Sequence, residues 1–275
     1  MRQDPWLNTS VHIVESRQSR PNLPSDGCPF CVGGLEAKEP YEIKSFVNRW
    51  PAMPDDRCEV VLYTSDHDSS LAELSTSNIK KIVDLWANRT DALMSRGDVQ
   101  NVLIFENRGR EVGATIDHPH GQIYAFDHVP ERTKKRIDNS WQPDSDSTRR
   151  FIEKDGWAAW VTYAPIYPVS IEIAPVKRIA DLTTMSETDR IAFAEILRDV
   201  LQRLDRLYAS KTPYMMWINQ QPKKYSTGWF NIEIISPWRE KDITRFIAAA
   251  EVATGEYFNP LNPEDLAKTL RSLNS

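Results

Sequence analysis

The chain carries the same order of predicted elements twice, and this repeat constrains its fold more than any other feature. Each copy contains a strand, a proline turn, a second strand, a charged turn, a short segment of Leu with Thr or Ser, and an amphipathic helix. The helices are predicted over residues 76–95 and 186–208, where apolar residues recur at helical spacing. Further strands follow, at residues 101–106, 120–126, 213–219 and 229–235. The repeat predicts an α+β fold in which each half packs a small antiparallel sheet against a long helix.

The repeat also predicts where the halves begin and end. The first half covers residues 1–130, a connector covers 131–156, and the second half covers 157–275. The connector is rich in charged side chains, and we expect it to be partly helical. A short helix over residues 263–273 is expected to close the chain.

Composition argues against two classes of partner. Hydrophobic residues make up 40% of the 275 residues and charged residues 27%, which is ordinary for a soluble globular protein. The net charge of −5 gives no overall positive field for nucleic acid, although local arginines can still bind a small anion. No apolar run approaches the roughly 20 residues that would cross a bilayer. Because the N-terminus lacks an apolar signal core, we expect no membrane partner and a cytoplasmic location.

The stretch 105–126 places polar side chains between two apolar strands. Two of the chain's five histidines, His118 and His120, lie here together with Gln122. Residues two apart in a strand point to one face, so these three share a face if the strand begins that early. A lone histidine in a strand is usually structural, but two at this spacing after a glycine-containing loop favour a functional role. The second copy has no histidine at the matching place, so we expect the chemistry in the first half.

The cysteines indicate a metal site. Cys28 and Cys31 form a C-x2-C pair, which in a cytosolic protein is half of a zinc site or a redox dithiol. A redox pair usually opens a helix, whereas Gly33 and Gly34 follow here, so zinc is favoured and two further ligands are needed. Cys58 lies in an apolar run and is predicted to be a small buried hydrophobe.

The segment 105–125, FENRGREVGATIDHPHGQIYA, resembles the signature of the galactose-1-phosphate uridylyltransferase family, a branch of the histidine triad (HIT) superfamily. The resemblance extends over most of the chain, including the C-x2-C pair, the turn at Asn48 and the turn at His67. It implies a duplicated HIT-like fold. It also implies the ping-pong exchange of a nucleoside monophosphate, with UMP expected, between a nucleoside diphosphate sugar and a sugar 1-phosphate.

The resemblance assigns the reacting groups. His120 would be the nucleophile, because a neutral imidazole attacks phosphorus near pH 7 and can leave again. Gln122 would hydrogen-bond a phosphoryl oxygen. Hydrolytic HIT proteins carry a third histidine at this position, and an amide cannot readily shuttle a proton to activate water. Transfer is therefore favoured over hydrolysis.

Further roles follow from the same matching. Cys28, Cys31, His67 and His118 match the zinc ligands, a closed Cys2His2 set with a structural role and one zinc per chain. Asn48 would contact the nucleoside. The matching substrate-binding positions for phosphates and sugar are Arg17, Arg20, Asn107, Gly113, Thr115, Arg245 and Glu251. Of these, Gly113 would allow close approach, and Arg245 with Glu251 would meet the sugar. The resemblance further implies a homodimer.

The chain departs from the family in its second half. Members often hold a second metal with histidines there, but the matching positions are Asn219, Asn231 and Glu233, and no histidine follows His128. We therefore expect no second metal. Three alternatives remain open: a phosphorylase or a transferase acting on another base or sugar phosphate, a hydrolase of dinucleotides or nucleoside conjugates, and a nucleotide-binding module without catalysis.

Overall fold

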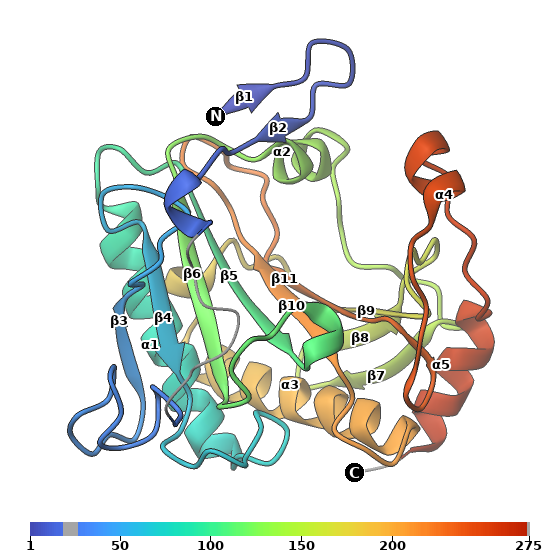
Figure 1. Cartoon of the computed structure of the whole chain (residues 1–275). Coiled ribbons are helices and arrows are strands. Elements are labelled where there is room, and N and C mark those ends of the chain that lie inside the picture. Colours follow the sequence, from blue (N-terminus) through green and yellow to red (C-terminus); the bar gives the residue numbers. More distant parts are fainter. Residues whose placement is uncertain (19–26, 274–275) are drawn as a thin grey trace.

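The computed structural model describes residues 1–18 and 27–273 and shows an α+β fold (Figure 1). Its main sheet, among the described residues, is antiparallel throughout and has the order β3-β4-β6-β5-β10-β11-β9-β8-β7. The strands are β3 (Lys44–Val47), β4 (Cys58–Leu62), β5 (Asn101–Arg108), β6 (His120–Phe126), β7 (Arg150–Lys154), β8 (Trp157–Val161), β9 (Val169–Pro175), β10 (Tyr214–Asn219) and β11 (Asn231–Ser236).

The two copies of the repeat share this sheet. Strand β5 of the first copy pairs with β10 of the second, from Arg108 opposite Tyr214 to Ile104 opposite Ile218. The sequence predicted two small sheets, and their pairing satisfies backbone groups that would otherwise lie at two open edges. The predicted fold class, antiparallel sheet packed with long amphipathic helices in duplicate, is confirmed. The boundaries at residues 130 and 157 stay a prediction.

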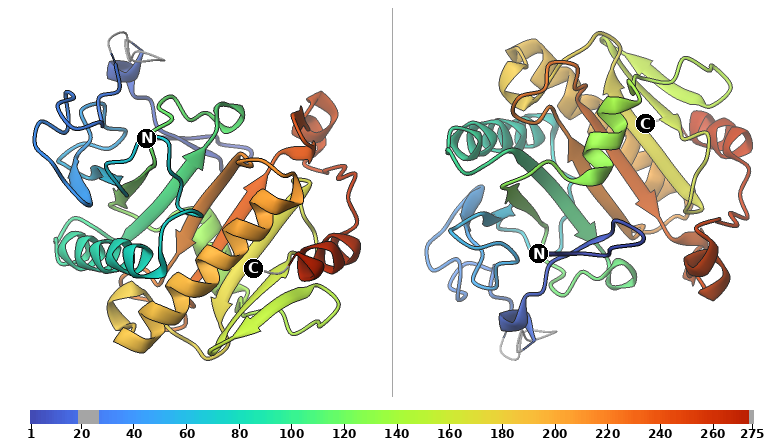
Figure 2. Two further views of the ribbon diagram at one scale, coloured as in Figure 1. Left: turned by 90° about the horizontal axis from the view of Figure 1, so that it is seen from below. Right: turned by 90° about the horizontal axis from the view of Figure 1, so that it is seen from above.

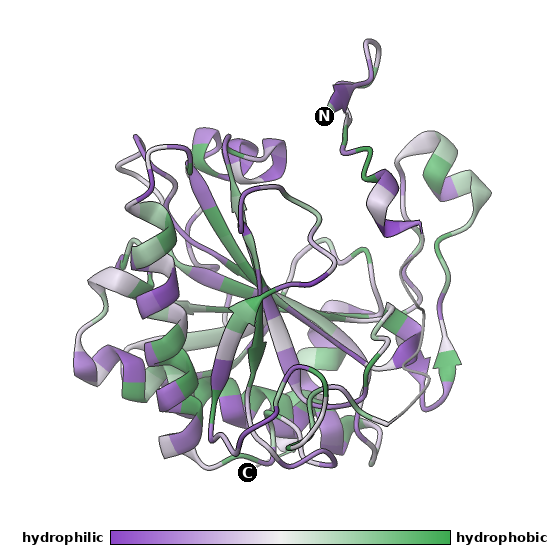
Figure 3. Cartoon of the chain, turned by 60° about the vertical axis from the view of Figure 1, so that its left-hand side comes forward, coloured by the Kyte–Doolittle hydropathy of each residue, from purple (hydrophilic) through white to green (hydrophobic). Residues whose placement is uncertain are grey.

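Helices α1 (Thr76–Met94) and α3 (Glu187–Leu207) cover one face of the sheet, as Figure 2 shows from below. Both agree with the sequence prediction within one residue at each end. Ser75 caps α1 by accepting the backbone N–H of Asn78, and Ser186 begins α3 with a capping box. Their apolar sides join the sheet in one large core. In Figure 3 the helices carry hydrophilic and hydrophobic residues side by side, as expected when only one side packs on a sheet.

Helix α2 (Glu131–Asp138) lies on the opposite face, over the second half of the sheet (Figure 2). It confirms the helical content expected in the connector. The connector also contains β7, which sequence reasoning missed because only Phe151 and Ile152 of its five residues are buried. The remaining elements are β1 (Arg2–Gln3), β2 (Ser10–Val11), η1 (Glu15–Arg17), η2 (Arg110–Val112), η3 (Leu182–Thr184), β12 (Trp238–Glu240), β13 (Ile243–Thr244), α4 (Ala249–Thr254) and α5 (Pro263–Ser272). Across the described ranges, no helix combines the length and apolar character that a bilayer span requires.

Candidate active site and metal centre

The side chains of two cysteines and two histidines converge in the first half of the chain. Cys28, Cys31, His67 and His118 place their ligand atoms within 4.8 Å of one another. The Sγ of Cys31 lies 3.4 Å from Nδ1 of His67 and 3.7 Å from Nδ1 of His118. Three separate segments supply these residues: the N-terminal turn, the loop after β4 and the approach to β6. Two thiols and two imidazoles at this spacing fit a closed tetrahedral zinc site.

The surroundings of His118 orient it as a ligand. Its Nε2 lies 2.8 Å from the carbonyl oxygen of Thr64, so Nε2–H donates there and Nδ1 turns toward Cys31. A backbone carbonyl that fixes the tautomer is the usual support of a metal-binding histidine. Burial lowers the pKa of His118, which favours the neutral imidazole that a metal requires.

His120 is the first residue of β6, and its ring is oriented by the residue two positions earlier. Nδ1 of His120 lies 2.7 Å from the carbonyl oxygen of His118. Since the carbonyl can only accept, Nδ1 carries the proton and Nε2 carries the lone pair. The ring of Phe30, from the C-x2-C turn, lies 5.0 Å from the His120 ring. The C-x2-C turn therefore contributes both to the Cys2His2 cluster and to the packing of the His120 ring.

Gln122 lies on the same side of β6 as His120, because exposure alternates along the strand. Its Oε1 accepts a hydrogen bond from Nδ2 of Asn48 at 3.3 Å. The strand begins at His120, so the face expected for three polar side chains carries two of them. Pro119 gives the reason, since it lacks the N–H that would extend the ladder. His118 turns instead to the metal cluster.

Gly121 lies between His120 and Gln122, and there is no room for a side chain at this position. A Cβ at this position would overlap the hydroxyl oxygen of Tyr63 and lie 2.9 Å from its Cζ. Tyr63 is buried under the strand, beside Trp86 of α1. Sequence reasoning missed this contact, although the glycine between His120 and Gln122 was its signal. The buried phenol packs directly against the strand that holds His120 and Gln122.

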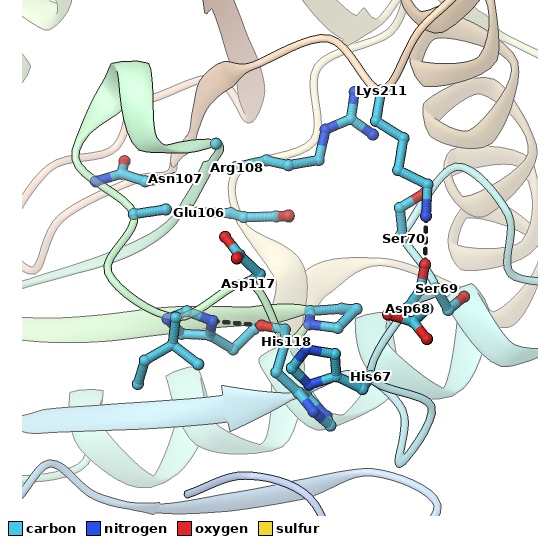
Figure 4. A pocket seen from close by; sticks show the side chains of 15 residues that line it. His67, Asp68, Ser69, Ser70, Glu106, Asn107, Arg108, Asp117, His118 and Lys211 are labelled. Carbon is cyan, nitrogen blue, oxygen red and sulfur yellow. Dashed lines mark hydrogen bonds between the residues drawn. The ribbon is translucent and has the colours of Figure 1, made fainter. Parts of the chain in front are cut away.

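A cavity of about 340 Å³ has His120 in its wall. Figure 4 shows this cavity, with Glu106 and Arg108 on one side and His67 and His118 on another. This volume is at the lower end of the range for small-molecule sites. The cavity is lined by His67, Asp68, Ser69, Ser70, Glu106, Asn107, Arg108, Gly109, Ala114, Ile116, Asp117, His118, Pro119, His120 and Lys211. Among the predicted substrate-binding residues, Asn107 is in this wall together with His120. Gly113, at a φ of 85°, and Thr115 lie in the loop whose Ala114 and Ile116 line the cavity.

Sequence reasoning missed the charged residues of the cavity wall, among them Glu106, Arg108 and Lys211. Glu106 is buried and accepts a hydrogen bond from the Tyr214 hydroxyl at 2.9 Å, and burial raises the pKa of Glu106 to about 7. Arg108 pairs with Asp205 of α3. Lys211, from the loop before β10, reaches across to the carbonyl of Asp68 (Figure 4). The signal for Glu106 was a carboxylate inside an apolar strand, but Lys211 belongs to the other half of the chain and had none.

Arg17, Arg245 and Glu251 do not line this cavity. Arg17 is half-buried at the end of η1, and Arg20 lies outside the described residues. Arg245 and Glu251 form a buried ion pair with each other in the C-terminal segment. Glu251 also accepts the backbone N–H groups of Ala248 and Phe258, at 3.0 Å each. Their expected contact with a sugar stays a prediction.

Comparisons with known proteins agree with this geometry. The profile of the galactose-1-phosphate uridyl transferase N-terminal domain matches residues 41–130, and that of the C-terminal domain matches residues 115–274. A galactose-1-phosphate uridylyltransferase of Thermotoga maritima is 32% identical over 98% of this chain and 97% of the relative. The chain belongs to the galactose-1-phosphate uridylyltransferase family. As a member of this family of nucleotidyltransferases, it is an enzyme.

The family likeness covers the whole fold. A solved structure of a uridylyltransferase superposes with a TM-score of 0.90 at 24% identity, covering 99% of this chain and 97% of that one. A more distant relative, the ADP-glucose phosphorylase of Arabidopsis thaliana, is 21% identical over 99% of this chain and 92% of the relative. The galactose-1-phosphate uridylyltransferase fold therefore also occurs in a protein that is named for a different reaction.

Proposed function

We propose that this enzyme transfers a nucleoside monophosphate, with UMP as the first choice, from a nucleoside diphosphate sugar to a sugar 1-phosphate through a nucleotidyl-His120 intermediate. One observation carries the proposal. The 2.7 Å hydrogen bond from Nδ1 of His120 to the His118 carbonyl leaves the lone pair on Nε2, in a side chain that lines the cavity. A neutral, oriented imidazole is what attack on phosphorus requires.

The reaction needs no net proton transfer. Nε2 of His120 forms a bond to the α-phosphorus, the bond from that phosphorus to the bridging oxygen breaks, and its electron pair leaves with the sugar 1-phosphate. The modified imidazole then carries a positive charge that the His118 carbonyl stabilises through Nδ1–H. In the second half-reaction an oxygen of the acceptor phosphate attacks phosphorus, and His120 leaves as neutral imidazole.

Gln122 favours transfer to a phosphate acceptor over hydrolysis by water. Because Gln122 Oε1 accepts from Asn48, its NH₂ group is available to donate to a phosphoryl oxygen. The amide does not take up a proton at neutral pH, so it cannot serve as a general base for water. The covalent intermediate is expected to wait for a phosphate acceptor.

Cys28, Cys31, His67 and His118 would hold one zinc ion in this proposal. The donor set fits zinc, and a closed site supplies rigidity instead of Lewis-acid catalysis. It would fix the C-x2-C turn and the approach to His120, and with them the carbonyl that orients the nucleophile. The zinc ion would thus support the reaction by holding the residues that orient His120, without contacting the substrate.

The other predicted residues complete the proposal. Asn107, Thr115 and Gly113 would contact the phosphates, Asn48 the nucleoside, and Arg17 with Arg20 the nucleotide phosphates. Arg245 and Glu251 do not line the cavity of their own chain. A sugar-binding role for these two residues would need a second subunit, in keeping with the homodimer that the family resemblance implies. A cytoplasmic location is part of the same proposal.

The test is covalent labelling with nucleoside diphosphate sugars that carry a radiolabelled α-phosphate. Wild type should acquire acid-labile, base-stable label from UDP-glucose, and His120→Ala should not. His128→Ala is the matched control, since this histidine lies outside the cavity wall and should label normally. A panel of UDP-, ADP-, GDP- and dTDP-sugars identifies the base. Equal labelling of wild type and His120→Ala would refute the covalent mechanism.

One specific observation supports a second candidate, a nucleotide-sugar phosphorylase. The Arabidopsis relative that aligns over 99% of this chain is named an ADP-glucose phosphorylase. The labelled enzyme separates the two: sugar 1-phosphate should discharge the label fast if the enzyme is a transferase, and inorganic phosphate should do so if it is a phosphorylase. Fast discharge by water alone would indicate the hydrolase that Gln122 argues against.

A further inference from the structure

Two carboxylates face each other on the second half of the sheet. Glu172 of β9 and Glu233 of β11 are direct cross-strand partners, and they are only 7% and 6% exposed. Both project to the side away from α3, because their neighbours Ile171, Ile173 and Ile234 pack in the core beneath α3. Like charges directly opposite each other in a buried setting repel, so the pair requires a cation between them.

Arg136 of α2 supplies that cation. Its Nη2 lies 2.9 Å from Oε1 of Glu172, and its Nη1 lies 3.1 Å from Oε1 of Glu233. Arg132, one helical turn earlier on the same side of α2, donates to Oε2 of Glu233 at 2.5 Å. The guanidinium of Arg136 also stacks 4.4 Å from the ring centroid of Trp141. One guanidinium thus bridges both carboxylates.

Neutral donors complete the coordination of the two carboxylates. The indole N–H of Trp160 donates to Glu172 at 3.1 Å, and that of Trp217 donates to Glu233 at 3.2 Å. Nδ2 of Asn219 donates to Glu233 at 2.9 Å. Burial raises the pKa of Glu172, and Arg136 is the largest influence that opposes the rise. The carboxylates are therefore held by donors on every side.

This cluster lies at the positions that match the family's second metal site, Asn219, Asn231 and Glu233. The residues present here do not fit a metal ion. The cluster offers amides and carboxylates in place of imidazoles. Transition metals such as zinc, iron and copper bind well to imidazole ligands. The buried amide of Asn231 makes no hydrogen bond with any described residue. A metal ion would also have to displace Arg136 from both carboxylates.

We propose that the Arg136 guanidinium replaces the second metal ion as the cation that fastens α2 across the second half of the sheet. The charge needed between Glu172 and Glu233 comes from the chain itself. The second half is then independent of metal supply, and α2 closes the sheet face that corresponds to the one bearing His120 (Figure 2). This inference does not depend on the proposed reaction, because it concerns only charge balance and folding.

Thermal unfolding of a charge-removing variant tests the proposal. Arg136→Met keeps an unbranched apolar stem but removes the guanidinium, and it should lower Tm on the order of 10 °C, since two buried carboxylates lose their cation. Lys135→Met is the matched control: it removes a charge from the preceding residue of α2, whose side chain is 70% exposed, and should leave Tm nearly unchanged. The triple variant Arg136→Met, Glu172→Gln, Glu233→Gln should recover part of the loss, because no uncompensated charge remains. If the single variant does not fold, this triple variant supplies the comparison.

Metal analysis provides the second, independent measurement. In the Cys28→Ser background the Cys2His2 site is disabled, so elemental analysis should find no tightly bound metal. Chelator should then leave Tm unchanged. One retained equivalent of a divalent metal, or a fall in Tm caused by chelator in this background, would overturn the proposal. So would an Arg136→Met variant that is as stable as Lys135→Met.

Discussion

The Nδ1–H of His120 donates to the main-chain carbonyl of His118, across 2.7 Å, and this bond connects the Cys2His2 cluster to the imidazole proposed as the nucleophile. His118 turns its own Nδ1 toward Cys31 and its Nε2 toward Thr64. His118 thus contributes its ring to the Cys2His2 cluster and its backbone carbonyl to the orientation of His120. Loss of the metal is expected to disturb the orientation of His120 without removing it.

We first predict that His118→Ala impairs transfer through loss of the metal site, because the ring of His118 is assigned to the zinc. The variant should lose the zinc and reduce kcat by roughly 10- to 100-fold, the usual effect of changing the support of a metal-linked group. Zinc content and steady-state transfer rates measure this. A variant that retains full zinc, or one that loses zinc with no change in kcat, would contradict the coupling. His128→Ala serves as the control.

A second prediction concerns the glycine between the reactive positions. Gly121→Ala places a methyl group against the Tyr63 ring and should destabilise the fold by about 1–3 kcal/mol. Tyr63→Phe removes the hydroxyl but leaves Cζ at 2.9 Å, so the double variant should recover only part of the loss. Urea unfolding of the four proteins in the cycle measures the coupling. Gly97→Ala has open space around its Cβ and should cost little.

A third prediction follows from the amide at Gln122. Gln122→His adds a group that can move a proton, so UMP release to water should rise by roughly 100-fold, the lower end of general acid–base effects. Gln122→Ala should lose transfer without gaining hydrolysis. Thin-layer separation of labelled products distinguishes UMP from the sugar nucleotide. Unchanged hydrolysis in Gln122→His would mean that the amide does not set the reaction outcome.

The fourth prediction uses the raised pKa of Glu106. Burial raises it from 4.5 to about 7, opposed by Arg108 and the Tyr214 hydroxyl, while Asp205 adds to the rise. The folded state therefore binds this proton more tightly than the unfolded chain. The resulting stabilisation is complete below about pH 4.5 and is lost as pH rises through 7.

Unfolding free energies at pH 5 and pH 8 measure that loss. Wild type should lose on the order of 3 kcal/mol more than Glu106→Gln over this interval. Glu111→Gln, at an exposed position of the neighbouring loop, should behave as wild type. An identical pH dependence in wild type and Glu106→Gln would show that the carboxylate stays ionised throughout.

Much of the fold was predictable because local signals agree with it. The two long helices have Ser75 and Ser186 at their caps and an apolar side at helical spacing, and β6 begins and ends where the sequence predicted. The pairing of β5 with β10 was not predictable, since two internal repeats do not reveal which edges meet. Strand β7 is too short and too polar to stand out.

Site residues were predictable from the sequence only where they belong to a recognisable motif. Cys28, Cys31, His67 and His118 meet as the family resemblance implied. Lys211 lines the cavity with His120 across the two halves, and nothing local to it indicates that contact. Arg136 lay in a charged connector, where a solvated side chain is the ordinary expectation. Its partners became visible only once β9 and β11 were paired.

The pairing of β5 with β10 makes the two halves inseparable as folding units. Cleavage between them would uncover the backbone edge of the strand that carries Glu106 and Asn107, and with it a site for strand addition by another chain. A fragment of the first half would contain Cys28, Cys31, His67, His118 and His120, but its β5 would lack the neighbouring strand β10.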